Sequence, residues 1–157
     1  MKTIIFFTLL AFTSLGQNNL PDHKVMIHEF MNATMDRDTA TISKYFADFA
    51  TYQVIDYEGN KQIMFYNYNK PVFLNSYVLN QERKWINEDN EMGTSLVEGV
   101  FGIVWTRYLQ HYDNNKKMCG VRTYNVFLAE NGWKIIQATE TRFKSCDGYV
   151  KTFHLPR

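Results

Sequence analysis

The chain has 157 residues, with 17 Lys and Arg against 16 Asp and Glu and a net charge of +1. This length fits one domain, and such a domain buries roughly two-thirds of the surface of its unfolded chain. The balanced charge argues against a protein that binds nucleic acid or an anionic membrane, because both need a basic excess. An apolar share of 45% excludes a disordered chain. Aromatic residues make up 16%, so their rings either fill a core or line a cavity.

The first segment has the pattern of a signal peptide. Met1-Lys2 precedes an apolar stretch to Leu15, and Ser14-Leu15-Gly16 places small residues where a signal peptidase cleaves. The run of about a dozen apolar residues is shorter than the ~20 that a membrane-spanning helix needs. We therefore predict a signal peptide over 1–16, one mature domain over 17–157, and export to the periplasm or the medium. An N-terminal core helix is the alternative. Cleavage leaves 157 less 16, or 141 residues, without net charge because Lys2 is lost.

Helices are predicted in the first half of the mature chain. Apolar residues recur at helical spacing after Pro21-Asp22, which predicts an amphipathic helix to about Met35. A second short helix is expected next, and either Asp38 or Thr39 can cap it. A third is predicted from 69 to about 84, opened by a proline.

Strands dominate the rest. A hairpin is predicted over 51–57 and 63–66, and 85–93 is either loop or strand. Longer strands are predicted over 100–112, 119–129 and 133–143, with turns at 113–116 and at Asn131-Gly132. Strands joined consecutively by short turns exclude a doubly wound sheet, so we predict an α+β fold.

Two segments carry a resemblance to a known family. They are Met35-Asp36-Arg37-Asp38 before Tyr45-Phe46-Ala47-Asp48, and Asn131-Gly132-Trp133-Lys134-Ile135-Ile136. With the order of elements, they resemble the nuclear-transport-factor-2-like superfamily over roughly 22–143, and more narrowly its SnoaL-like branch of small bacterial proteins. The resemblance implies a cone-shaped, curved antiparallel sheet wrapped around about three N-terminal helices, with a cavity at its open end. Members include dehydratases, ketosteroid isomerases, epoxide hydrolases and cyclases, so the fold does not select a function.

The register of the last strands predicts a pocket. If Asn114-Asn115 and Asn131-Gly132 are two-residue turns, they fix which residues of the last three strands lie opposite one another. Residues that pair directly share a face of the sheet. One concave face is then apolar at one end and carries arginines at the other. The predicted pocket is lined by Phe101, Ile103, Trp105, Arg107, Arg122, Tyr124, Val126, Gln137 and Thr139. A slip of one residue would move every side chain to the other face.

The opposite face predicts an association surface. Its middle holds an apolar patch rimmed by charges: Val104, Phe127, Ile136 and Ala138. Because the family often dimerises by its sheets, the resemblance implies a homodimer; cover by helices or by the C-terminal tail is the alternative.

Cys119 and Cys146 are a candidate disulfide in an exported protein, the alternative being two free buried thiols. In the predicted register they are a diagonal pair ~7 Å apart, and a bulge near Ser145 would close that distance.

Evidence for catalysis in the sequence is weak. Enzymes of this superfamily place a carboxylate, a histidine or a tyrosine inside the cone, and the candidates here are Tyr124, Asp56 and His28. Each also has a purely structural explanation: Tyr124 as a core ring, Asp56 as a solvated strand end, and His28 as an exposed helix position. Gln137 and Thr139 stand where many SnoaL-like sequences have a histidine, and neither exchanges protons near neutral pH.

Metal and cofactor sites are not predicted. The four histidines are scattered, no cysteine or carboxylate lies near them at ligand spacing, and glycine-rich phosphate loops are absent from the sequence. Arg107 and Arg122, opposite each other in the predicted register, suit an anionic group on a ligand, unless each pairs with a carboxylate instead.

The sequence favours an exported protein that binds a small, mostly apolar molecule without turnover. Two rivals stay open: an isomerase, dehydratase or hydrolase acting on a small apolar substrate, and a dimerisation or protein-interaction module whose interior is filled by its own rings. No nucleic-acid partner and no membrane span are expected.

Overall fold

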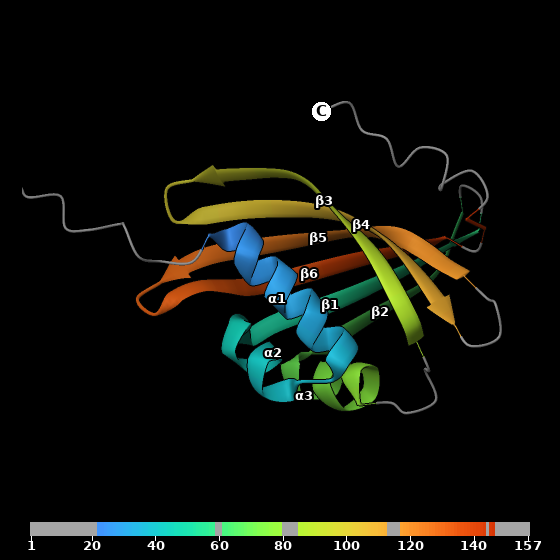
Figure 1. Ribbon diagram of the computed structural model, residues 1–157, viewed down its shortest axis with the longest axis horizontal. Coiled ribbons are helices and arrows are strands. Elements are labelled where there is room, and N and C mark those ends of the chain that lie inside the picture. The colour runs from blue at the N-terminus through green and yellow to red at the C-terminus, as the bar shows by residue number, and fades with distance from the viewer. Residues whose placement is uncertain (1–21, 59–60, 80–84, 113–116, 144, 147–157) are drawn as a thin grey trace, which may run out of the picture.

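The computed structural model describes residues 22–58, 61–79, 85–112, 117–143 and 145–146. The predicted signal peptide, the turn at 113–116 and the end of the predicted third helix lie outside them. The described part of the chain begins with two helices, α1 (His23–Asp36) and α2 (Thr39–Tyr45) (Figure 1). After the first two strands come α3 (Lys70–Val72) and η1 (Phe73–Val78), a wider π-type turn that continues α3.

The chain has six described strands: β1 and β2 lie between α2 and α3, and the other four come after η1. Their bounds are β1 (Phe46–Glu58), β2 (Lys61–Asn69), β3 (Trp85–Glu98), β4 (Phe101–Tyr112), β5 (Lys117–Ala129) and β6 (Gly132–Phe143). They form one open sheet in the order β2-β1-β6-β5-β4-β3, antiparallel except where β1 runs parallel to β6. The predicted α+β class is confirmed, and the ambiguous stretch 85–93 is part of a strand.

Short polar side chains define the helix ends. The Asp22 carboxylate accepts the amide of Lys24 at the start of α1, and Arg37 ends that helix in a left-handed conformation with φ of 59°. Asp38 then accepts the amides of Ala40 and Thr41. Capping at both ends of this tight connection turns α2 back against α1.

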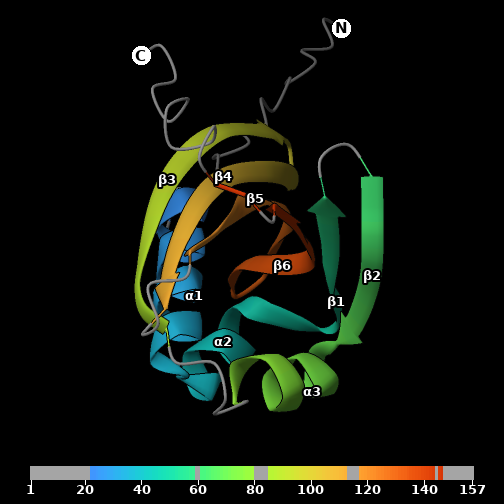
Figure 2. The same cartoon turned by 90° about the vertical axis from the view of Figure 1, so that its right-hand side faces the viewer.

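The sheet curves around α1, which lies against its concave side (Figure 2). The core between them is built from aromatic rings: the Phe30 ring lies 5.9 Å from that of Phe46 and 6.0 Å from that of Tyr124. Phe73 stacks on Tyr52 at 4.3 Å and closes the bottom of the core. Much of the aromatic share thus fills the interior.

β4 and β5 pair one residue away from the predicted register. Val104 lies opposite Tyr124, and His111 lies opposite Lys117. The five residues between this last pair are an odd number, whereas a two-residue turn requires an even one. Because side chains alternate, the predicted faces of β4 were wrong. Four predicted pocket residues therefore lie on the convex face, away from α1: Phe101, Ile103, Trp105 and Arg107.

A β-bulge displaces β6 in the same way. Asn125 pairs with Gln137 and Val126 pairs with Ile135, so Ile136 is an extra residue. Beyond it, Gln137 and Thr139 lie on the convex face. The predicted turn also differs: Ala129 pairs with Gly132, which leaves Glu130 and Asn131 as the turn.

The predicted dimer patch is split by these shifts. Val104 and Ala138 are buried on the concave side, whereas Phe127 lies on the convex face. Ile136, the extra residue of the bulge, lines a groove described below.

A disulfide joins Cys119 on β5 to Cys146, with Cα atoms 5.8 Å apart. It is covered by Leu109 and Phe143 on the convex side. No helix in the described part of the chain has the length and hydropathy needed to cross a membrane.

Candidate functional site

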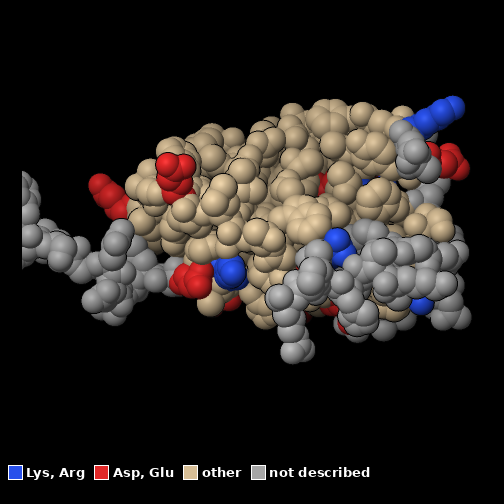
Figure 3. All heavy atoms as spheres, turned by 90° about the horizontal axis from the view of Figure 1, so that it is seen from above, with Lys and Arg blue, Asp and Glu red and all other residues tan. Residues whose placement is uncertain are grey.

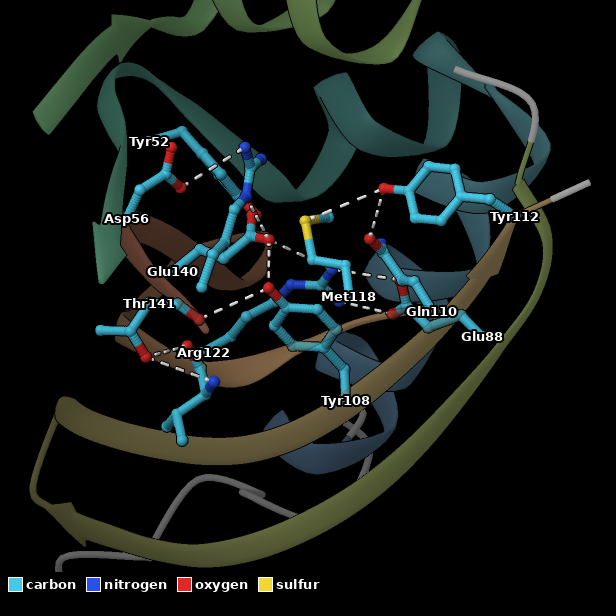
Figure 4. Close-up of polar contacts among 12 residues, drawn as sticks. Tyr52, Asp56, Glu88, Tyr108, Gln110, Tyr112, Met118, Arg122, Glu140 and Thr141 are labelled. Atoms are coloured by element: carbon cyan, nitrogen blue, oxygen red, sulfur yellow. Dashed lines mark hydrogen bonds and ion pairs between the residues drawn. The ribbon is translucent and has the colours of Figure 1, made fainter. Parts of the chain in front are cut away.

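The concave side of the sheet carries a buried network of charged and hydroxyl groups (Figure 4). We call it the interior network. It consists of Tyr52, Asp56, Glu88, Tyr108, Gln110, Arg122, Glu140 and Arg142. These residues come from five strands, β1 and β3–β6, so residues far apart in the sequence come together on this face.

Glu140 is the centre of the network and has no exposed surface. The phenols of Tyr52 and Tyr108 donate hydrogen bonds to its two oxygens, at 2.5 Å and 2.7 Å. Arg142 donates through Nε at 3.0 Å to the oxygen that Tyr108 also contacts. Both carboxylate oxygens are therefore engaged.

Arg122 connects this carboxylate to a second one. Its guanidinium donates two hydrogen bonds to Glu88, at 2.5 Å and 3.1 Å, and lies 3.9 Å from Glu140. The Tyr108 ring lies beneath it, with 4.0 Å between the guanidinium carbon and the ring centroid. Gln110 donates a further hydrogen bond to Glu88. Arg122 is thus held by charge on two sides and by a ring face on a third.

The surrounding charges keep Glu140 and Arg122 ionised in spite of their burial. Burial alone would raise the pKa of Glu140, but the charges of Arg142 and Arg122, with the hydrogen bonds from Arg142 and Tyr52, outweigh it and hold that pKa well below its usual value. For Arg122, burial would lower the pKa, but the Glu88 charge, helped by the other anionic and phenolic groups, keeps it well above its usual value. Glu140 and Arg122 are therefore fixed charges near neutral pH.

Little free space adjoins the network. A cavity of about 10 Å³ lies between α1 and the sheet, which is room for one water molecule. Its walls are Phe30, Met31, Thr34, Met35, Tyr52, Glu88, Arg122 and Tyr124. Within the described residues, this part of the cone is filled by its own side chains.

Solved structures match the chain over most of its length. An NTF2-like protein from Cytophaga hutchinsonii gives a TM-score of 0.59 at 10% identity, over 75% of this chain and 93% of that one. A ketosteroid isomerase-like protein from Erwinia carotovora atroseptica gives 0.56 at 7%, over 76% and 92%. An NTF-2 like protein of unknown function from Shewanella oneidensis gives 0.54 at 14%, over 75% and 94%. The chain has the nuclear-transport-factor-2-like fold.

The predicted nuclear-transport-factor-2-like fold is confirmed. The narrower SnoaL-like branch stays a prediction. No protein-family model matches the sequence, and no curated protein matches it either. Identities of 7–14% do not transfer chemistry from these neighbours, so function must be argued from the site.

The three candidate catalytic residues do not form one site in this NTF2-like fold. His28 is exposed on α1, next to Asn32. Tyr124 is buried in the core, and Asp56 lies near the far end of β1, paired with Arg142. Among the residues that the structure describes, no three His, Cys, Asp or Glu side chains gather in a way that could hold a metal ion.

The predicted pair of arginines is separated by the sheet. Arg122 pairs with Thr106 and points inward, whereas Arg107 pairs with Val121 and lies over the Trp105 ring on the convex face, at 5.1 Å. The predicted anion site between Arg107 and Arg122 was therefore wrong. The weighed alternative, pairing with a carboxylate, holds for Arg122.

Gln137 and Thr139 belong to a row of polar side chains on the convex face. Gln137 donates to Gln53 at 3.0 Å and accepts from Asn125 at 2.9 Å, while Thr139 donates to Gln53 at 3.2 Å. These contacts join β1, β6 and β5 on the convex face, opposite the interior network.

Sequence reasoning missed most of the interior network. In the predicted register Glu140 and Arg142 share the outer face with Ala138, because residues two apart on a strand lie on one face, and Glu88 lies in the ambiguous stretch. From Thr139 to Arg142 every residue of β6 is polar, so this segment has no alternation of polar and apolar residues to indicate which side is buried. Only the bulge at Ile136 decides it.

An apolar groove lies at the end of the sheet away from the interior network. It has a volume of about 370 Å³ and is lined chiefly by Leu96, Phe101, Ile103, Val126 and Ile136. Leu96 is 70% exposed and Phe101 59% exposed. Viewed from above, the described surface is mostly uncharged, with acidic and basic side chains gathered towards its ends (Figure 3).

Proposed function

We propose that this NTF2-like chain is an exported protein that binds a small, mostly apolar molecule without turnover. The observation that carries the proposal is the state of the two buried carboxylates. Glu140 and Glu88 accept hydrogen bonds from arginine and other donors at both oxygens. A general base needs an available oxygen and a pKa near the working pH, and neither condition is met at Glu140.

The apolar groove is the proposed ligand site. Its volume of about 370 Å³ falls within the range of small-molecule pockets. Phe101 and Ile103, which the sequence predicted inside the cone, lie on the convex face and line this groove together with Val126. The lining offers contact area and one carboxylate, Glu98, rather than reactive pairs of groups. This chemistry suits an uncharged apolar ligand.

Titration with an environment-sensitive apolar dye tests the groove. Ile103→Glu places a charge in it and should abolish the dye's fluorescence gain, while Val25→Glu on α1 should leave it unchanged. Ile103 and Val25 are both 50% exposed, so the two variants are matched in burial and charge. Equal dye binding by both would refute the groove as the site. Native mass spectrometry of protein from its own host should show a co-purifying molecule.

We also propose a homodimer formed through the same convex face. Phe49 is 72% exposed, and the centroid of its ring lies 6.4 Å from that of the Phe127 ring. Both rings extend the apolar surface of the groove. A nearly uncharged, exposed apolar surface is typical of an interface core, and a second copy can cover it symmetrically. Such a partner would also close the open groove over a ligand.

Sedimentation equilibrium tests the dimer. The protein should sediment as a dimer at micromolar concentration, and Phe101→Glu should make it monomeric because it charges the centre of the patch. Val25→Glu should stay dimeric. A monomeric wild type would refute the dimer without affecting the dye titration.

Export is supported by the Cys119–Cys146 disulfide, since such bonds persist in oxidising compartments. Intact-mass analysis of the protein from its host should give a chain that begins at Gln17. A chain that still carries the first sixteen residues would contradict the proposed cleavage.

A further inference from the structure

The interior network is a series of alternating charges. Glu88 lies 2.5 Å from Arg122, which lies 3.9 Å from Glu140. Glu140 lies 3.0 Å from Arg142, and Arg142 lies 3.9 Å from Asp56. Three carboxylates alternate with two guanidinium groups, so the series has a net charge of −1 and ends on an anion at both sides.

The two ends of the series differ in how they are compensated. The Glu88 side chain is 1% exposed and receives both guanidinium donors and Gln110. The Asp56 side chain is 26% exposed, and its contact with Arg142 at 3.9 Å is too long for a hydrogen bond. Its Oδ1 accepts no hydrogen bond from any described residue. The uncompensated charge therefore lies at Asp56.

Apolar and aromatic groups stand next to this carboxylate. Met64 on the edge strand β2 pairs directly with Asp56, so the two side chains share a face, and Met64 is 54% exposed. The Tyr66 hydroxyl donates to the Met64 sulfur. A sulfur atom and a ring beside a partly exposed carboxylate offer contacts to an alkyl stem and to a cationic head.

We propose that Asp56, Met64 and Tyr66 form a binding site for a small organic cation. An ammonium or guanidinium head binds the Asp56 carboxylate and continues the alternation of charge, while a short aliphatic stem lies against Met64. Charge-assisted hydrogen bonds are among the strongest contacts available to such a ligand, and one positive charge balances the series. An anion is repelled by the same carboxylate. This site faces inward and is independent of the apolar groove.

Binding of butylammonium, measured by chemical-shift titration, tests the proposal. The expected result is saturable binding with shifts at Asp56, Met64 and Tyr66, and no binding of butyrate or butanol. Asp56→Asn keeps the shape of the side chain and should weaken binding roughly tenfold or more, since a hydrogen bond to a charged group is lost. Asp89→Asn is the matched control, because Asp89 is an exposed carboxylate on the opposite edge strand.

Two results would overturn the proposal. One is equal binding of butylammonium and butyrate, which would mean that charge plays no part. The other is unchanged affinity in Asp56→Asn, with a melting curve that shows the variant to be folded. The dye titration of the groove does not depend on either outcome.

Discussion

The hydroxyl of Tyr108 lies 2.8 Å from the position that a Cβ atom of residue 120 would occupy. The two residues pair directly across β4 and β5, and Gly120 leaves the room in which the Tyr108 ring extends over the sheet to reach Glu140. A Cβ here would also lie 1.8 Å from the carbonyl oxygen of Thr141, which is backbone and cannot move aside. Gly120 is thus required by the interior network.

Gly120→Ala should therefore destabilise the fold by about 3 kcal/mol, at the upper end of the cost of overpacking. Urea denaturation followed by tryptophan fluorescence measures the change. Gly99→Ala is the control: nothing lies within 4 Å of its Cβ position, so only its left-handed backbone, at φ of 59°, is strained. If both variants lose the same stability, the close approach at Gly120 has no energetic weight.

Glu140→Gln should cost about 3–5 kcal/mol, because it leaves Arg142 and Arg122 buried without their central counter-charge. Thermal and urea unfolding both report it. Asp48→Asn, which removes an exposed carboxylate paired with the partly buried Lys70, should cost much less. Adding Arg142→Gln to Glu140→Gln should recover part of the loss, since one unpaired guanidinium is removed; strictly additive losses would contradict the coupling.

The order of elements could be predicted from the sequence because it depends on local signals. Asp22 and Asp38 cap helices where the pattern placed them, and long apolar-rich runs became strands. α3 and η1 form the described part of the third helix, up to Val78, and its predicted end lies outside the described residues.

The faces of the strands could not be predicted because they depend on single residues in turns and bulges. The connection between His111 and Lys117 has an odd number of residues, which reverses the predicted faces of β4. The extra residue at Ile136 does the same for β6 beyond the bulge. The same shifts moved Glu140 from the expected outer face to the centre of the interior. Neither event leaves a strong local signal, so the site was misplaced although the fold was right.

Stability should fall in acid through Glu140. Its pKa in the folded chain is held well below the usual 4.5, chiefly by Arg142 and Arg122 against the effect of burial. As the pH falls below about 4.5, the unfolded chain takes up a proton here while the folded chain does not, so the free energy of unfolding decreases. The contribution is fully present above that pH. Urea denaturation between about pH 6 and pH 3 should show a steep decline in wild type and a flatter one in Glu140→Gln; parallel curves would exclude Glu140 as the cause.

The Cys119–Cys146 disulfide should contribute about 3–4 kcal/mol, because it closes a loop with a sequence separation of 27 and restricts the unfolded chain. The loop contains all of β6, so in the unfolded chain the bond keeps that strand near its neighbour β5. Replacing both cysteines by serine, or reducing the wild type with dithiothreitol, should lower the unfolding midpoint in urea by the same amount. Agreement between the two is the control, since serine also removes sulfur from the cluster with Leu109 and Phe143. A wild type whose midpoint is insensitive to reduction would show that the bond adds no stability to this sheet.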